Sequence, residues 1–169
     1  MRVGFVGLGK LGLPVALAVE AAGHEVRGWD ISDEVLKILV SRQLPYLEEG
    51  AQELLRESKI LTQQPHELAE WADLIFVAVQ TPHQPEFEGT TRLPDERADF
   101  DYTHLLKAVA SLDGHGDCPI VIISTVLPGT VESVIFNDPS LWLDKSRILY
   151  NPFFIAMGTT IPDFRNPEF

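Results

Sequence analysis

The glycine-rich segment "VGLGKLG" is the first candidate site in the chain. Its three glycines follow the G-x-G-x-x-G spacing: Gly7, Gly9 and Gly12. An apolar, strand-like run at residues 2–7 leads into them and a helix-like run covers residues 10–22, which is the context of a dinucleotide-binding turn. In such a turn the glycines permit a tight bend, close approach of a pyrophosphate, and close packing of helix on strand. We therefore expect the backbone amides around Lys10 and Leu11 to face phosphate groups.

Asp30 follows Gly12 by eighteen residues and ends the next strand-like run, "HEVRGWD". A carboxylate at this position can accept hydrogen bonds from both hydroxyls of a ribose, and it repels a 2′-phosphate. The same carboxylate could also serve the start of the helix that follows, and one side chain can do both. The glycine turn and Asp30 together predict NAD, in preference to NADP, as the cofactor.

Hydroxyl side chains stand where two further strand-like runs end. Thr81 closes "VAVQTP", and Ser124 and Thr125 belong to "IISTVLPGT". Taken singly, each of these residues is more typical of a cap or a turn. Ligands of open α/β sheets, however, bind outside the carboxyl ends of the strands. We therefore expect these hydroxyls to meet the nicotinamide half of the cofactor.

Strand-like and helix-like runs alternate along the whole chain. Strands are expected at residues 2–7, 24–30, 59–63, 72–82, 119–125 and 146–151. Helices are expected at residues 10–22, 32–41, 51–58, 65–72, 101–112 and 129–136. This alternation predicts an α/β fold, a doubly wound parallel sheet of the Rossmann type. We expect residues 1–169 to form a single dinucleotide-binding domain in which the acidic residues 83–100 are a solvated insertion rather than a binding flap.

Composition and charge argue against several classes of protein. Thirteen basic and twenty-five acidic side chains give a net charge of −12, which disfavours binding to nucleic acid or to an anionic membrane. No apolar run approaches the ~20 residues that span a bilayer, and the histidines show no metal-ligand spacing, so no metal is expected. The single cysteine, Cys118, cannot form an internal disulfide, and no secretory signal opens the sequence. A cytoplasmic location is therefore expected.

Five segments carry a resemblance to a known family. They are "FVGLGKLGLPVALA", "LPYLEEGAQELL", "ADLIFVAVQTP", "ISTVLPGT" and "YNPFF". In this order they resemble the N-terminal domain of the UDP-glucose/GDP-mannose dehydrogenase family over essentially the whole chain. The first segment is shared with other dehydrogenases, whereas "STVLPGT" after "VAVQTP" is much more specific. The resemblance implies NAD contacts at Gly7, Gly9, Gly12, Asp30, Thr81, Pro82, Ser124 and Thr125.

The family's chemistry supplies further expectations. Its members oxidise the C6 alcohol of a nucleotide sugar to a carboxylate with two NAD, through a thiohemiacetal and a thioester on a cysteine. The resemblance gives Thr125 a catalytic role in positioning the hydrolytic water, and it places Asn151, Phe154 and Ile155 on the substrate side. It also implies a part in making polysaccharide precursors and allows a homo-oligomer.

The sequence departs from the family in two places. The family continues into a central helix and a second domain, which supply the nucleophilic cysteine; Cys118, just before a buried strand, indicates a structural thiol. After Asn151-Pro152, the family has two glutamates where this chain has Phe153 and Met157, and a basic residue where it has Ala156. Phe and Met cannot act as a general base. Either they pack under the missing domain or a partner, or the hydrolysis step is altered.

Three interpretations therefore remain at this stage. The leading one is the NAD-binding domain of a nucleotide-sugar 6-dehydrogenase, part of an enzyme and inactive alone. The second is a stand-alone NAD-binding module without chemistry, favoured by Phe153 and Met157. The third is the N-terminal domain of a 3-hydroxyacid dehydrogenase, against which "VAVQTP" and "STVLPGT" both argue.

Overall fold

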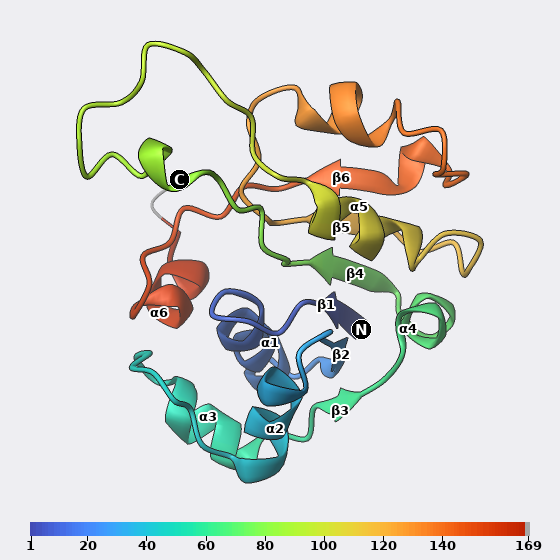
Figure 1. Cartoon of the computed structure of the whole chain (residues 1–169). Helices are drawn as coiled ribbons and strands as arrows, with labels where there is room; N and C mark the ends of the chain where they lie inside the picture. Colours follow the sequence, from blue (N-terminus) through green and yellow to red (C-terminus); the bar gives the residue numbers. More distant parts are fainter. Residues whose placement is uncertain (168–169) are drawn as a thin grey trace.

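A single six-stranded sheet forms the centre of the molecule in the computed structural model, which describes residues 1–167 (Figure 1). All strands are parallel, and their order is β3-β2-β1-β4-β5-β6. Their bounds are Arg2–Val6 for β1, Glu25–Trp29 for β2, Leu61–Thr62 for β3, Leu74–Val77 for β4, Ile120–Ile122 for β5 and Ile148–Tyr150 for β6. The order reverses between β1 and β4, so the predicted doubly wound parallel sheet is confirmed.

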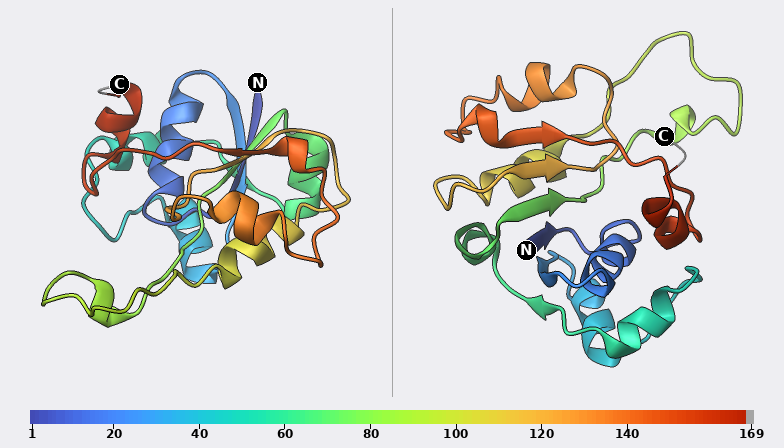
Figure 2. Two further views of the ribbon diagram at one scale, coloured as in Figure 1. Left: turned by 90° about the horizontal axis from the view of Figure 1, so that it is seen from above. Right: turned by 180° about the vertical axis from the view of Figure 1, so that it is seen from behind.

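Helices cover both faces of the sheet (Figure 2). They are α1 (Gly12–Ala21), α2 (Asp33–Ser41), α3 (Ala51–Glu57), α4 (Pro65–Trp71), α5 (Thr103–Ala110) and α6 (Thr160–Arg165), with short helical turns at Pro85–Phe87, Val131–Ile135 and Lys145–Arg147. One core cluster joins the sheet to α1, α2, α3 and α6, and another joins it to α4 and α5. The protein therefore has the three layers of an α/β fold.

Helix α1 is buried over most of its length because it lies between the sheet and the helices α3 and α6. Every residue from Gly12 to Val19 is buried. Such a uniformly apolar helix is typical of one enclosed on all sides.

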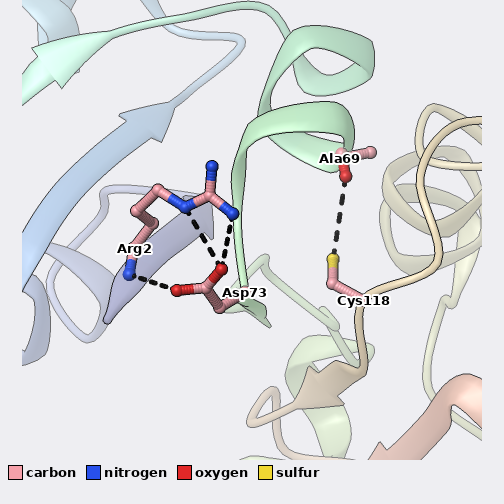
Figure 3. Close-up of polar contacts among 4 residues, drawn as sticks. All are labelled: Arg2, Ala69, Asp73 and Cys118. Atoms are coloured by element: carbon pink, nitrogen blue, oxygen red, sulfur yellow. Dashed lines mark hydrogen bonds and ion pairs between the residues drawn. The ribbon is translucent and has the colours of Figure 1, made fainter.

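An ion pair lies at the amino-terminal end of the parallel strands. Arg2 binds Asp73 through its backbone amide and its guanidinium, with distances of 2.6–3.1 Å, and joins the start of β1 to the start of β4 (Figure 3).

The strands β4 and β5 are shorter than predicted. The ladder stops soon after Val77 and Ile122, because the amide of Val79 donates to the Ser124 hydroxyl instead of to a backbone carbonyl. The predicted helix at 129–136 is a π-helical turn over Val131–Ile135. Residues 83–100 extend away from the sheet, and all but Phe87 and Phe100 are exposed.

Helix α6 was missed by the sequence prediction, which assigned no element after residue 151. The carboxylate of Asp163 in its first turn accepts hydrogen bonds from the Ala156 amide and the Thr159 hydroxyl, both at 2.9 Å. Ile161 is buried in the core cluster that contains α1. A six-residue helix depends on such tertiary contacts, because isolated short helices are unstable in water.

Candidate cofactor-binding site

A cavity of about 1000 Å³ lies at the carboxyl ends of β1, β4 and β5. The turn at residues 8–11 forms its floor, and residues 78–82 and 124–125 form one side. Helix α2 and the loop that follows it, as far as Tyr46, form the other side, and Met157 also lines the cavity. This position, where the strand order reverses, is where open α/β sheets bind their ligands.

The three glycines of the turn have different reasons to be glycine. Gly7 has a φ of +97°, and a Cβ there would collide with the carbonyl of Ala78. A Cβ on Gly12 would collide with the carbonyl of Gly7. At Gly9, by contrast, a Cβ would meet nothing within 4 Å. Gly7 and Gly12 are thus required by the fold itself, whereas Gly9 leaves open a stretch of backbone that a bound group can approach.

Backbone donors of the turn remain available to a ligand. Within residues 1–167, the amides of Gly9, Lys10 and Leu11 donate no hydrogen bond, and all three residues line the cavity. They precede α1, whose N-terminus carries a partial positive charge. Free amides beside the open space at Gly9 fit the pyrophosphate of a dinucleotide. The structure thus brings the predicted phosphate-binding residues together.

Asp30 holds the turn in place. Its Oδ2 accepts a hydrogen bond of 2.7 Å from the Leu8 amide, and its Oδ1 accepts one of 2.8 Å from the Ser32 amide. Both of these partners, Leu8 and Ser32, line the cavity, although Asp30 does not line it itself. Each carboxylate oxygen keeps a second lone pair that can accept a further hydrogen bond. The expected bond to a ribose hydroxyl stays a prediction.

The three predicted hydroxyl side chains differ in what they can offer. Ser124 is 2% exposed, and its hydroxyl donates to the Val79 carbonyl at 2.8 Å while accepting from the Val79 amide at 2.9 Å. Thr81 donates to the Thr125 carbonyl at 2.5 Å. Both therefore bind backbone and shape the wall, which also includes Pro82. The exposed hydroxyl of Thr125 has no partner within residues 1–167 and is available to a ligand.

The residues predicted on the substrate side lie elsewhere. Asn151, Phe154 and Ile155 line a second cavity of about 590 Å³, together with α6. The structure therefore does not bring them together with the cofactor cavity. Sequence alone could not place them, because the position of this segment depends on α6.

Phe153 and Met157 also separate in the structure. The ring of Phe153 packs against Phe76 and Phe164, with centroid distances of 6.2 and 5.4 Å. Phe153 is thus partly buried against the core of its own domain, and it also lines the second cavity, so the expectation that it packs under another domain or a partner stays a prediction. Met157 is 66% exposed and lines the cofactor cavity.

Tyr46 is a cavity residue that the sequence interpretation did not single out. Its hydroxyl is buried, and the structure described here, residues 1–167, gives it no hydrogen-bond partner. Burial, with a smaller contribution from the charge of Glu48, raises the pKa of Tyr46 to about 12, so the ring stays neutral. The ammonium of Lys10 lies 6.0 Å from its ring centroid. The segment "LPYLEEG", part of the resemblance, was the available signal.

Cys118 lies at the opposite end of the sheet from the cavity, just before β5. Its Sγ is 3.9 Å from the carbonyl oxygen of Ala69 (Figure 3). Burial raises the pKa of the Cys118 thiol, which keeps it protonated and poorly nucleophilic. The interpretation of Cys118 as a structural thiol agrees with this placement.

Comparison with known proteins identifies the family. The family model described as the NAD-binding domain of the UDP-glucose/GDP-mannose dehydrogenase family matches residues 1–169. The chain belongs to this family. Membership in the UDP-glucose/GDP-mannose dehydrogenase family decides against the 3-hydroxyacid dehydrogenase interpretation, and it makes NAD the cofactor of this domain.

Relatives and solved structures agree with this assignment. The chain is 28% identical to a UDP-glucose 6-dehydrogenase of Rickettsia conorii and 30% identical to a GDP-mannose 6-dehydrogenase of Pseudomonas syringae, each over 99% of its length. It spans 38% and 39% of these two relatives. A crystal structure of a ternary complex of GDP-mannose dehydrogenase from Pseudomonas aeruginosa shares the fold, with a TM-score of 0.81 at 24% identity, covering 99% of this chain and 39% of the other.

Within residues 1–167, no helix is long and apolar enough to cross a membrane. The same residues contain no group of three or more His, Cys, Asp or Glu side chains that could hold a metal ion.

Proposed function

We propose that this domain serves a nucleotide-sugar 6-dehydrogenase, which oxidises a sugar alcohol to a carboxylate with NAD. The observation that carries the proposal is the open turn at Gly9, with three free amides beside it, in a member of this family. We further propose that residues 1–169 form one domain, that the enzyme works in the cytoplasm on precursors of polysaccharides, and that it can assemble as a homo-oligomer.

The residues of the cavity divide the work of holding NAD. The free amides of Gly9, Lys10 and Leu11, with the Lys10 ammonium, bind the pyrophosphate. Asp30 accepts hydrogen bonds from the adenosine ribose and disfavours the 2′-phosphate of NADP. Bound NAD would supply the acceptor for the hydride that leaves the sugar carbon. The free hydroxyl of Thr125 would lie on the side of the nicotinamide half of the cofactor and would orient the water that completes the oxidation.

The chain alone lacks the means to finish this reaction. Its single cysteine, Cys118, is at the wrong end of the sheet, so no thioester can form at the cavity. Phe153 and Met157 replace the two carboxylates that the family resemblance leads one to expect. The nucleotide sugar would meet this domain together with a second domain that supplies the nucleophile. We expect the 169-residue chain to bind NAD and to produce no NADH.

A second candidate function is a stand-alone NAD-binding module without chemistry. Two observations favour it: Phe153 packs its ring against Phe76 and Phe164, and Met157, which lines the cofactor cavity, cannot exchange protons. The coding sequence beyond residue 169 separates the two candidates. A continuation that encodes a cysteine-bearing second domain supports the dehydrogenase, whereas a stop codon supports the module.

Titration calorimetry tests the cofactor assignment directly. We expect NAD to bind and NADP to bind more weakly. Asp30→Ala should weaken NAD by about 1–3 kcal/mol, the scale of a lost charged hydrogen bond, and should narrow the preference for NAD over NADP. Unchanged NAD affinity in Asp30→Ala would exclude Asp30 from the ribose site.

A further inference from the structure

Glu48 is a buried carboxylate in the loop between α2 and α3, the same loop that walls the cofactor cavity. It is 8% exposed, and within residues 1–167 it is the one buried side chain of the Asp, Glu, Lys or Arg type. The described residues give it no ion-pair partner. Burying a carboxylate is costly unless hydrogen bonds replace its water. Its placement therefore points to specific partners.

Those partners all come from the far end of the chain. Glu48 Oε1 accepts a hydrogen bond of 2.6 Å from the Thr160 amide. Oε2 accepts one of 3.0 Å from the Gly158 amide and one of 3.1 Å from the hydroxyl of Thr160, which is fully buried. The amide of Glu49 adds a bond of 2.9 Å to the Gly158 carbonyl. These four bonds between residues 48–49 and residues 158–160 are here called the Glu48 clasp.

Both sides of the Glu48 clasp adjoin the wall of the cavity. Tyr46, two residues before Glu48, lines the cavity beside Lys10 of the glycine turn. Met157, directly before Gly158, lines it as well. The clasp thus joins two parts of one cavity wall that are more than one hundred residues apart in sequence.

We propose that Glu48 is a positioning residue for the cofactor: it does not line the NAD cavity itself but holds Tyr46 and Met157 in the cavity wall. The inference rests on the proposed function, because the wall it positions is the wall of that cavity. A second consequence follows from the same bonds. Residues 151–155, shortly before the clasp residue Gly158, line the second cavity, so the clasp links the cofactor site to the side on which the resemblance places the substrate.

The test compares Glu48→Gln with Glu49→Gln in the 169-residue chain. The first variant replaces one acceptor oxygen with an NH2 donor. This donor would face either the amide of Thr160 or the amide of Gly158 and the Thr160 hydroxyl. The second changes the exposed neighbour, whose backbone amide alone belongs to the clasp. We expect Glu48→Gln to raise the NAD dissociation constant about tenfold, a loss of about 1.4 kcal/mol. Glu49→Gln should stay within about twofold, as surface substitutions do.

NMR separates positioning from simple support of the fold. In the wild-type chain, NAD should shift the amide resonances of Gly158 and Thr160 and slow hydrogen exchange at the Glu49 amide. In Glu48→Gln both responses should disappear while the resonances of β1 and β4 keep their native positions. Thr160→Val, which removes one hydroxyl donor from the clasp, should give a smaller change in the same direction and serves if Glu48→Gln does not fold.

Two results would overturn the role of Glu48. One is native NAD affinity in a folded Glu48→Gln variant. The other is the absence of any response at Gly158, Thr160 and Glu49 when the wild type binds NAD. If the wild type binds no NAD at all, the proposed function fails instead. The clasp is then tested in the absence of cofactor. Relative to the wild type, Glu48→Gln must speed hydrogen exchange at the Glu49 amide and shift the Tyr46 ring resonances; otherwise the proposal is wrong.

Discussion

The glycine turn after β1 and the segment after β6 occupy the same edge of the sheet but are built in opposite ways. In the turn, backbone groups stay free, and the Asp30 carboxylate fixes the loop from behind. In the segment after β6, an aromatic side chain fills the space where the family resemblance leads one to expect a carboxylate, and Phe153 packs against Phe76 and Phe164. The glycine turn therefore leaves backbone donors free for a ligand, whereas in the neighbouring segment Phe153 packs against the core and most of the other residues are exposed.

The largest expected effect comes from Gly12, which serves the fold and not the ligand. Gly12→Ala puts a methyl group into the carbonyl of Gly7 and the side chain of Ala78, inside a buried helix that cannot move aside. We expect a loss of about 4 kcal/mol in the free energy of unfolding, or a failure to fold. Urea denaturation measures it. A stable Gly12→Ala protein would show that α1 can shift. It would then be wrong that the fold requires glycine at this position of the turn.

Phe153→Glu should have the next largest effect. It places a carboxylate against the rings of Phe76 and Phe164, and we expect a loss of about 2–3 kcal/mol in stability. The same denaturation experiment applies, with the exposed Met157→Glu as its control. A loss below about 0.5 kcal/mol, the scale of surface substitutions, would mean that Phe153 is replaceable and that this segment is not committed to the core.

Gly9→Ala separates ligand binding from folding. Its Cβ meets nothing in the protein, so stability should change by less than about 1 kcal/mol, the helix-propensity scale. The methyl group lies where the pyrophosphate approaches, so we expect the NAD dissociation constant to rise about thirtyfold, or about 2 kcal/mol. Calorimetry with NAD measures the second change. Undiminished affinity would place the pyrophosphate away from this turn.

Met157→Glu should have the smallest effect. The side chain is exposed, so its replacement should change stability by less than about 0.5 kcal/mol. A carboxylate there also faces a cavity meant for an anionic cofactor, so NAD affinity should fall slightly. Thermal melting and calorimetry check the two expectations. A large loss of stability would show that Met157, like Phe153, is built into the core.

The sequence predicted the sheet and the glycine turn because both depend on local patterns. Apolar runs fixed the strands, and the spacing of Gly7, Gly9 and Gly12 fixed the turn after β1. Sequence reasoning failed where distant segments decide the outcome. Helix α6 depends on contacts with residues far away in the chain, among them the Glu48 clasp. The engagement of Ser124 with Val79 depends on two strand ends lying side by side, which no local pattern records.

The side-chain bonds that Ser124 and Thr81 make to backbone have a consequence for the thermodynamics of binding. They join the extensions of β4 and β5 into one wall before any ligand arrives. Association normally loses free energy because loops and side chains must become ordered. A wall that is already preorganised loses little conformational entropy when it is occupied. The nicotinamide end of NAD should therefore bind here with a small entropic penalty.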